Sequence, residues 1–166
     1  HGSRCIAVWE SNDLVNWSEQ RLVEVSPELA GNTWAPEIFY DHTTGEYIVF
    51  WASKIYPDAN KTGSPHNRMM YAKTRDFYTF TPAEEYYNPG YSVIDTTMIE
   101  HDGKIYRFTK DERSYHSTEA PNGKMVFQDV GDSVLGEFTS IVEGIGKGTI
   151  SVGEGPTVFK DNNEDK

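Results

Sequence analysis

Short apolar runs alternate with turn-forming clusters along the whole chain, and this pattern is clearest at residues 92–112. There the run TTMIE leads into a His-Asp-Gly turn, and the run KIYRF follows the turn directly. Apolar and β-branched runs of about four to eight residues, bounded by such turns, are typical of β-hairpins. The same layout occurs at 34–53 and begins again at 154–166. No segment has the spacing of an amphipathic helix, so the pattern predicts an all-β fold.

The hairpin layout repeats at a fixed spacing. Pro36, Thr96 and Pro156 begin equivalent runs and follow one another in steps of 60 residues. A second phrase repeats nearly in step, because Asp13 and Asp76 lie 63 residues apart in similar surroundings. We expect both aspartates to form turns between outer strands. A constant period of this size indicates stacked supersecondary units, and the strand-turn-strand content of each unit is typical of β-blades.

The predicted strands divide one partial domain, residues 1–166, into four units. The boundaries are 1–30 for the end of one blade, 31–90 for a second blade, 91–150 for a third blade and 151–166 for the start of a fourth. These units contain two, four, four and one expected strands, eleven in all, and the last is PTVFKD at 156–161. Blades stack face to face into a ring. We therefore expect an arc of a β-propeller, about three blades of four antiparallel strands, which a missing segment or a second chain would complete.

Composition and charge restrict the partners. A net charge of −11 and a pI of about 4.8 argue against binding to nucleic acid or to an anionic membrane surface. The single cysteine, Cys5, excludes an internal disulfide and a zinc cluster, and the histidines lack the spacing of metal ligands. No metal or other cofactor is predicted. The aromatic content of 13% suits stacking on sugar rings, so a neutral carbohydrate is a compatible substrate.

Two acidic residues stand at the starts of repeated units. In a propeller the first strand of each blade lines the central channel, so Asp95 and Glu154 would meet at one mouth of that channel. Two converging carboxyl groups can hydrolyse a glycosidic bond if one of them stays protonated, and a neighbouring carboxylate favours the protonated form. Alternatively, Asp95 caps a turn and Glu154 is a solvated hairpin residue, as most acids of an acidic protein are. Spacing alone leaves both interpretations open.

Four phrases of the chain, in order, resemble glycoside hydrolase family 43. They are ESNDLVNW, WAPEIFYD, VIDTTMIEHDGKIYRF and EGPTVFK, and the resemblance covers residues 3–160. It implies a five-bladed β-propeller enzyme of the β-xylosidase or α-L-arabinofuranosidase type. The implied reaction is inverting hydrolysis of xylose- or arabinose-containing plant polysaccharides or oligosaccharides, without a cofactor. Such enzymes meet polysaccharide outside the cell or short oligomers inside it, which favours a secreted or periplasmic location over the cytoplasm without establishing either.

The resemblance also implies roles for single residues. Glu154, in EGP, matches the general acid, and Asp95, in VIDTT, matches the aspartate that orients and tunes that acid. The family more often has proline where Thr96 stands. The general base belongs on the first strand of the first blade, which we do not find in this chain. The 166 residues are therefore expected to be an incomplete inverting catalyst.

Three further residues are candidates for substrate binding. Trp34 would place an aromatic ring at the mouth of the pocket, where sugar C–H faces stack, although a core position between blades is equally compatible with the pattern. Trp51 and Arg107 lie on equivalent second strands. Arg107 could pair with Asp95 or contact a sugar hydroxyl, and a purely structural salt bridge is the alternative.

Two other functions compete with this interpretation. Retaining enzymes of a neighbouring five-bladed family that cleaves sucrose and fructans carry Arg-Asp-Pro and Glu-Cys phrases. Here Ile94-Asp95-Thr96 and Glu154-Gly155 stand in their places, which argues against that family. The second alternative is a non-catalytic carbohydrate-binding or scaffolding fragment, inactive because the base is missing.

Overall fold

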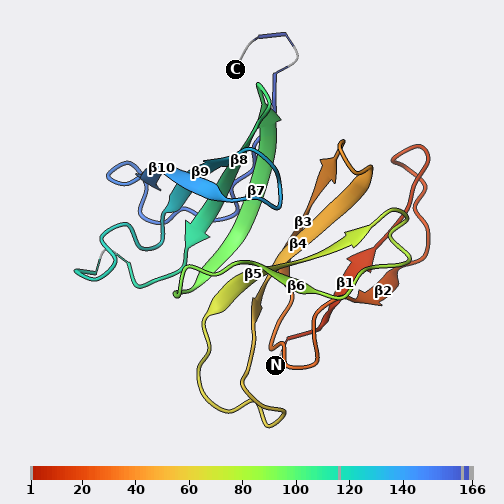
Figure 1. Ribbon diagram of the computed structural model, residues 1–166, viewed down its shortest axis with the longest axis horizontal. Helices are drawn as coiled ribbons and strands as arrows, with labels where there is room; N and C mark the ends of the chain where they lie inside the picture. Colours follow the sequence, from red (N-terminus) through yellow and green to blue (C-terminus); the bar gives the residue numbers. More distant parts are fainter. Residues whose placement is uncertain (1, 116, 162, 165–166) are drawn as a thin grey trace.

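The computed structural model describes residues 2–115, 117–161 and 163–164, and within them it contains ten β-strands and no helix (Figure 1). All strands belong to three antiparallel sheets. The N-terminal sheet contains β1 (Cys5–Val8) and β2 (Arg21–Glu24). The middle sheet contains, in spatial order, β3 (Trp34–Asp41), β4 (Glu46–Lys54), β5 (Asn67–Thr74) and β6 (Glu84–Tyr87). The third sheet contains, in the same kind of order, β7 (Val93–His101), β8 (Lys104–Asp111), β9 (Val126–Gly131) and β10 (Phe138–Ile145).

The all-β prediction is confirmed, but the expected eleventh strand at 156–161 is absent. Residues 154–161 form no strand, and Phe159 is 79% exposed. An extended segment becomes a strand only when its backbone N–H and C=O groups pair with those of a neighbour. No described strand pairs with this segment, so its apolar residues remain outside any sheet.

Local turn chemistry sets the hairpins. In the β7–β8 hairpin, His101 pairs with Lys104, and the two residues between them, Asp102 and Gly103, have φ values of 50° and 71°. Positive φ at both central positions is the geometry of the two-residue turn that Asp-Gly favours. This turn therefore fixes which residues of β7 and β8 face each other.

The middle sheet is buried on both faces, because a core cluster lies on each side of β4. Ile48, Phe50 and Ala52 pack toward the third sheet, in a cluster that includes Val93, Ile94 and Phe127. The alternate residues Val49 and Trp51 pack toward the N-terminal sheet. This explains why β4 is a nearly continuous apolar run rather than an alternating one.

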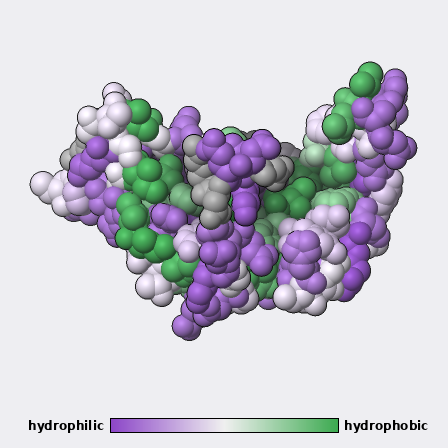
Figure 2. All heavy atoms as spheres, turned by 90° about the horizontal axis from the view of Figure 1, so that it is seen from above, coloured by the Kyte–Doolittle hydropathy of each residue, from purple (hydrophilic) through white to green (hydrophobic). Residues whose placement is uncertain are grey.

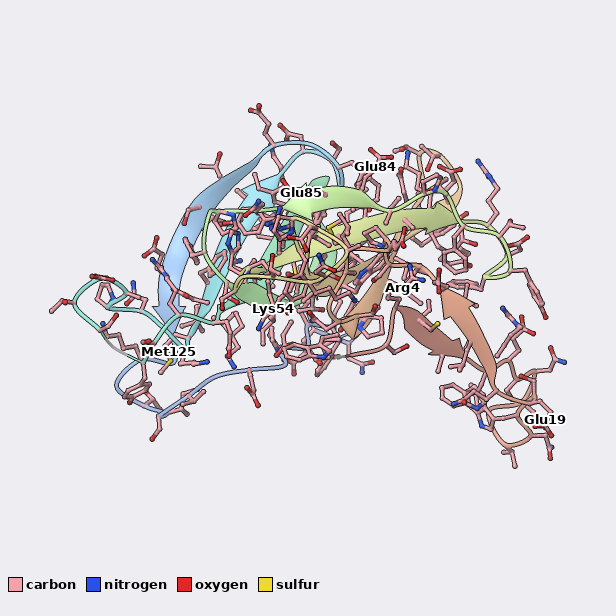
Figure 3. All side chains as sticks on the ribbon, turned by 90° about the horizontal axis from the view of Figure 1, so that it is seen from below. Arg4, Glu19, Lys54, Glu84, Glu85 and Met125 are labelled. Carbon is pink, nitrogen blue, oxygen red and sulfur yellow. The ribbon has the colours of Figure 1, made fainter. Side chains whose placement is uncertain are left out.

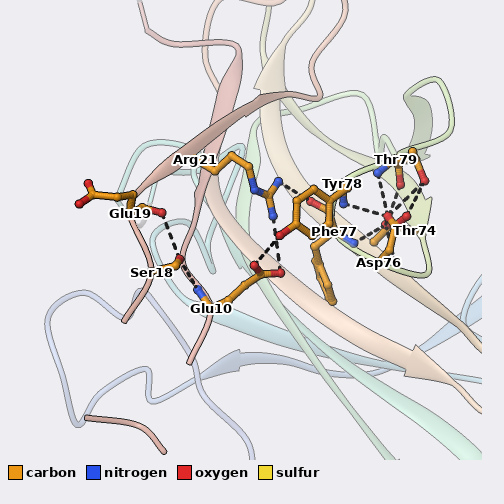
Figure 4. A network of polar contacts seen from close by, with 9 residues as sticks. All are labelled: Glu10, Ser18, Glu19, Arg21, Thr74, Asp76, Phe77, Tyr78 and Thr79. Carbon is orange, nitrogen blue, oxygen red and sulfur yellow. Dashed lines mark hydrogen bonds and ion pairs between the residues drawn. The ribbon is translucent and has the colours of Figure 1, made fainter. Parts of the chain in front are cut away.

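Polar contacts also join the N-terminal sheet to the middle sheet (Figure 4). Arg21 lies over the ring of Tyr78 at 3.8 Å and donates to the carbonyl oxygen of Phe77 at 2.8 Å. The Tyr78 hydroxyl donates to Glu10 Oε2 at 2.6 Å. Asp76 accepts hydrogen bonds from the backbone amides of Tyr78 and Thr79, which confirms that it forms a turn.

Asp13 forms the equivalent turn in the N-terminal sheet. Its Oδ1 accepts hydrogen bonds from the backbone amides of Val15 and Asn16 at 2.9 and 2.7 Å. These bonds favour the ionised carboxylate and hold the pKa of Asp13 well below its usual range. The predicted role of Asp13 as a turn residue is thus confirmed.

Several acidic residues lie on the periphery. Glu84 and Glu85 on β6, and Glu19 in the loop before β2, are exposed and project outward (Figure 3). Other parts of the surface are apolar. Figure 2 shows hydrophobic areas on either side of a hydrophilic ridge. The exposed apolar residues of the chain include Trp9, Trp17 and Ile38 near the N-terminal sheet. Within the described residues, no helix is long and apolar enough to cross a membrane.

Candidate active site

Three equivalent residues, one from each repeated unit, share an unusual backbone conformation. Ala35, Asp95 and Gly155 have φ values of 47°, 53° and 58° and follow one another in steps of 60 residues. The strand register shifts next to the first two, between Trp34 and Glu37 and between Ile94 and Thr97. A bulge with a left-handed residue bends the strand and redirects the side chains beside it. Non-glycine residues in this region are strained and concentrate at functional sites.

The starts of β3 and β7 and the equivalent segment 155–157, which is not a strand, converge on one hollow with a volume of about 260 Å³. β3 and β7 lie side by side (Figure 1), and residues 155–157 also line the hollow. The lining residues are Ala35, Pro36, Glu37, Asp95, Thr96, Gly155, Pro156 and Thr157. Residues of all three repeated phrases therefore line one hollow, and of the two acids expected to meet there, Asp95 lines it and Glu154 does not.

Asp95 projects into this hollow and links the third unit to the fourth. The backbone amide of Gly155 donates a hydrogen bond to Asp95 Oδ2 at 3.1 Å. Next to it, the buried Thr96 hydroxyl lies 2.8 Å from the hydroxyl of Thr109 on β8. Thr96 thus anchors the strand start beneath Asp95, at the position where the resemblance implied proline.

Glu154 directly precedes the lining residues 155–157 in the chain but does not line the hollow itself. Its Oε2 accepts a hydrogen bond from Lys110 Nζ at 2.5 Å, and its side chain is 67% exposed. The Lys110 side chain is only 2% exposed, and its Nζ also lies 2.9 Å from Glu112 Oε2. Burial disfavours the ammonium form, but the bonds to Glu154 and Glu112 outweigh this effect and raise the pKa of Lys110. The structure therefore brings Asp95 into the hollow and directs the Glu154 carboxylate toward Lys110.

Glu112 continues this chain of charges to Lys124. Glu112 is about one quarter exposed and forms ion pairs with both Lys110 and Lys124. Burial acts to raise the pKa of Glu112, and the two lysines reverse the effect and lower it. The backbone carbonyl of Lys124 also accepts a hydrogen bond from the amide of Gly153 at 2.9 Å. The segment that carries Glu154 is thus tied to this network at two points.

Trp51 and Arg107 were expected to bind substrate, and the structure places both in the core instead. Trp51 has no exposed surface, and its Nε1 donates to Ser53 Oγ at 3.1 Å. Arg107 is 4% exposed, and its Nη2 donates to Asp129 Oδ2 at 2.6 Å. Its guanidinium group also lies 4.1 Å from the ring centroid of Tyr87. Both side chains are buried by neighbouring sheets, and Arg107 forms the structural salt bridge that was the alternative to a sugar contact.

Trp34 is on the surface rather than in the core. It is 48% exposed and directly precedes the lining residue Ala35. A side chain in this position has free aromatic surface beside the hollow. Among the described residues Trp34 is therefore not a core residue, and contact with a sugar stays a prediction.

Glu37 lines the hollow and was missed by the sequence analysis. It stands in the same place of the repeat as Thr97 and Thr157, and burial raises its pKa while a hydrogen bond from Thr97 acts in the opposite direction. The 60-residue repeat could have predicted this position, because it aligns Glu37 with Thr97 and Thr157, two residues after Asp95 and Gly155. Within the described ranges, no cluster of three or more His, Cys, Asp or Glu residues could hold a metal ion.

Comparison with known proteins places this arrangement in a family. A family-43-related group, described as a probable glycosyl hydrolase domain, matches residues 1–166. The chain belongs to this family. A relative named alpha-L-arabinofuranosidase, from Bifidobacterium longum subsp. longum, is 34% identical over 76% of the chain. The alignment spans 13% of that relative's length, so this family-43-related chain corresponds to a small part of it.

Two solved structures share the fold of this family-43-related chain. A thermostable family-43 glycoside hydrolase matches 82% of the chain with a TM-score of 0.56 and 17% identity, over 45% of its own length. The family 117 glycoside hydrolase Zg3597 of Zobellia galactanivorans matches 68% of the chain with a TM-score of 0.50 and 15% identity, over 39% of its own length. The chain thus spans less than half of each of these solved structures.

Proposed function

We propose that these residues form part of an inverting glycoside hydrolase that acts on arabinose- or xylose-containing plant polysaccharides or oligosaccharides. The proposal rests on one observation above all, the convergence of three equivalent segments, the starts of β3 and β7 and residues 155–157, on a hollow that holds Asp95. Family membership supports hydrolysis as the reaction. The name of the Bifidobacterium relative favours an α-L-arabinofuranoside over a β-xyloside as the substrate.

In this proposal Glu154 donates the proton to the leaving oxygen, and Asp95 orients it. Glu154 directly precedes Gly155, and the Gly155 amide donates a hydrogen bond to Asp95. This bond holds the backbone that carries Glu154 next to the Asp95 carboxylate. To act in this way, the exposed Glu154 side chain must leave Lys110 and turn into the hollow. A separate base must activate water on the opposite face of the sugar.

We further propose that the three sheets are blades of a five-bladed propeller, with the divisions at 1–30, 31–90, 91–150 and 151–166. The two complete sheets support this proposal, since each has four strands in sequential order and they pack through the core between β4 and β7. Further polypeptide would add inner strands beside β1, cover exposed residues such as Ile38 and supply the base. The carbohydrate in the hollow is then the ligand of the assembled ring.

A non-catalytic carbohydrate-binding role is the second candidate, and one observation favours it. The Glu154 carboxylate is held by the buried Lys110 outside the hollow. If that ion pair persists with a sugar bound, the hollow binds carbohydrate without donating a proton. Turnover therefore separates the two functions.

The test compares this chain with a longer polypeptide in which the same residues are embedded in a complete ring, called the ring-completed polypeptide below. Hydrolysis of p-nitrophenyl α-L-arabinofuranoside and β-D-xylopyranoside is measured for both. Glu154→Gln removes the proposed acid, and Glu137→Gln, at an exposed site in the turn between β9 and β10, is the matched control. The anomeric configuration of the released sugar, followed by NMR, shows whether the reaction inverts.

We expect the ring-completed polypeptide to release the inverted sugar. Glu154→Gln should lose about 10²-fold or more in kcat on arabino-oligosaccharides, as loss of a general acid does, and less on the p-nitrophenyl glycosides, whose leaving group needs little protonation. Glu137→Gln should behave like the parent. Absence of turnover on both substrates, with retained binding of arabino-oligosaccharides, would favour the non-catalytic role. A product of retained configuration would contradict the inverting mechanism.

A further inference from the structure

The hollow contains a second carboxyl group besides Asp95. Of the residues that line it, Glu37 and Asp95 are the ionisable ones. They come from β3 and β7, the first strands of neighbouring sheets, which lie against each other. A ligand that occupied this hollow would therefore meet carboxyl groups from two sheets.

The surroundings of Glu37 differ from those of the acids that form turns. Asp13 and Asp76 each accept several backbone hydrogen bonds, which hold the carboxylate in its loop and lower its pKa. Glu37 instead stands inside a strand, where the Thr97 hydroxyl is its polar partner and burial raises its pKa. Glu37 therefore has no role in forming a turn that would explain why an acidic residue stands at this position.

Glu37 retains free hydrogen-bonding capacity in the hollow. A carboxylate has about four acceptor sites, and the bond from Thr97 uses one of them. Within the described residues, no lysine or arginine forms an ion pair with Glu37. A half-buried carboxyl group without a cationic partner suits a neutral ligand that carries hydroxyl groups, since each hydroxyl can donate to it without adding charge.

We propose that Glu37 is a sugar-binding residue, which accepts a hydrogen bond from a ring hydroxyl of the pentose held next to Asp95 and thereby sets specificity. The inference builds on the proposed glycosidase function. It adds a contact from the middle sheet, so that the middle and third sheets both bind the same sugar unit. The exposed ring of Trp34, at the start of the same strand, would flank that unit.

The experiment uses Glu37→Ala and Glu37→Gln in the ring-completed polypeptide, with Glu100→Gln as the matched control. Glu100 is an exposed acid near the other end of β7, away from the hollow. Thermal unfolding shows that each variant is folded. Kinetics are measured on p-nitrophenyl α-L-arabinofuranoside and on its analogues that lack the 2-, 3- or 5-hydroxyl group. Glu37→Gln preserves size and an acceptor, so it tests the contact even if Glu37→Ala does not fold.

We expect Glu37→Ala to lower kcat/KM by about 10- to 100-fold, mainly by raising KM, and Glu37→Gln to lower it by less. With the parent, one deoxy analogue should be hydrolysed more slowly than the full substrate. With Glu37→Ala, that analogue and the full substrate should be hydrolysed at similar rates, because the two changes remove the same bond. Glu100→Gln should match the parent. If Glu37→Ala loses the same factor on every analogue, or loses nothing, Glu37 does not bind a sugar hydroxyl.

A failure of the glycosidase proposal can be distinguished from a failure of this one. If the parent hydrolyses neither the furanoside nor the xyloside, the proposed reaction is wrong. Binding of arabino-oligosaccharides is then followed by tryptophan fluorescence. Weaker binding by Glu37→Ala than by Glu100→Gln would support the contact, and equal binding by both, or none by the parent, would overturn it.

Discussion

The backbone amide of Gly155 donates a hydrogen bond to the carboxylate of Asp95, 3.1 Å away and 60 residues earlier in the chain. Both residues have left-handed backbone conformations, and both occupy the same place in the repeated phrase. Glycine adopts this conformation without strain, and aspartate adopts it more readily than most residues. The contact therefore joins the start of β7 to the equivalent segment of the next unit and fixes the proposed orienting carboxylate within the hollow.

This relationship predicts that Asp95→Asn and Asp95→Ala differ in stability. Asparagine tolerates the left-handed region and still accepts the Gly155 hydrogen bond, so Asp95→Asn should unfold close to the parent. Alanine pays the backbone strain and loses the bond, for a cost of about 2 kcal/mol. Urea unfolding of the purified chain measures both. In the proposed enzyme, each variant should also lose kcat.

Ala35→Gly is the converse control, because Ala35 occupies the equivalent strained position without a side-chain role. Its φ of 47° is compatible with glycine. Relief of strain should exceed the extra entropy of the unfolded chain and give a net gain of about 1 kcal/mol. A loss of stability in Ala35→Gly would contradict the argument that strain is stored at these strand starts.

The Lys110–Glu112–Lys124 network predicts a pH-dependent contribution to stability. The pKa of Glu112 is lowered in the folded chain, so its contribution is present above its unfolded pKa and disappears as the pH falls through the folded pKa. The pKa of Lys110 is raised, so its contribution is present below the unfolded pKa of lysine and disappears as the pH rises through the folded value. The network should therefore stabilise the fold between these two limits.

Glu112→Gln tests the acid limit. It should destabilise the chain by about 1–2 kcal/mol at neutral pH, a value reduced for the partial exposure of Glu112. The difference from the parent should vanish at a pH low enough to protonate Glu112 in both states. Urea unfolding at a series of pH values measures this. A difference that persists unchanged in acid would show that side-chain packing, and not charge, is responsible.

Arg107 should act through stability rather than through substrate contact. Arg107→Met leaves the buried Asp129 without its cation, which should cost about 3–5 kcal/mol. The double variant Arg107→Met/Asp129→Leu should recover most of this loss, because it removes both charges from the core. Unfolding measurements establish the recovery. A folded double variant of the ring-completed polypeptide with an increased KM would contradict a structural role.

The strands and the convergence of their starts could be predicted from the sequence because both depend on local or periodic signals. Asp102 and Gly103 determine their hairpin through backbone preference, and the 60-residue period aligns Asp95 with Gly155. The direction of Glu154 could not be predicted, since it depends on Lys110, which lies 44 residues away and gives no local signal. The absence of a strand at 156–161 could not be predicted either, because an apolar run does not reveal whether a neighbouring strand is available to pair with it.

The burial of Trp51 was hidden by the fact that both faces of β4 are core. Alternation along a strand assigns side chains to two faces, but it does not tell a face that lines a pocket from one covered by another sheet. Glu37 was missed for a different reason. It stands in the largely apolar phrase WAPEIFYD, and the signal for its place at the hollow is not local but lies in the register with Thr97 and Thr157.

Trp34 and Trp51 lie on neighbouring strands of the middle sheet and should respond in opposite ways to replacement by alanine. Trp51→Ala removes a fully buried side chain and should cost about 3–5 kcal/mol of unfolding free energy. Trp34→Ala removes a half-exposed one beside the hollow and should change stability by about 0.5 kcal/mol. In the proposed enzyme, Trp34→Ala should instead raise KM, because the sugar loses its stacking surface. If Trp34→Ala leaves KM unchanged in a folded, active protein, the ring does not contact the sugar, and recognition falls to polar groups such as Glu37.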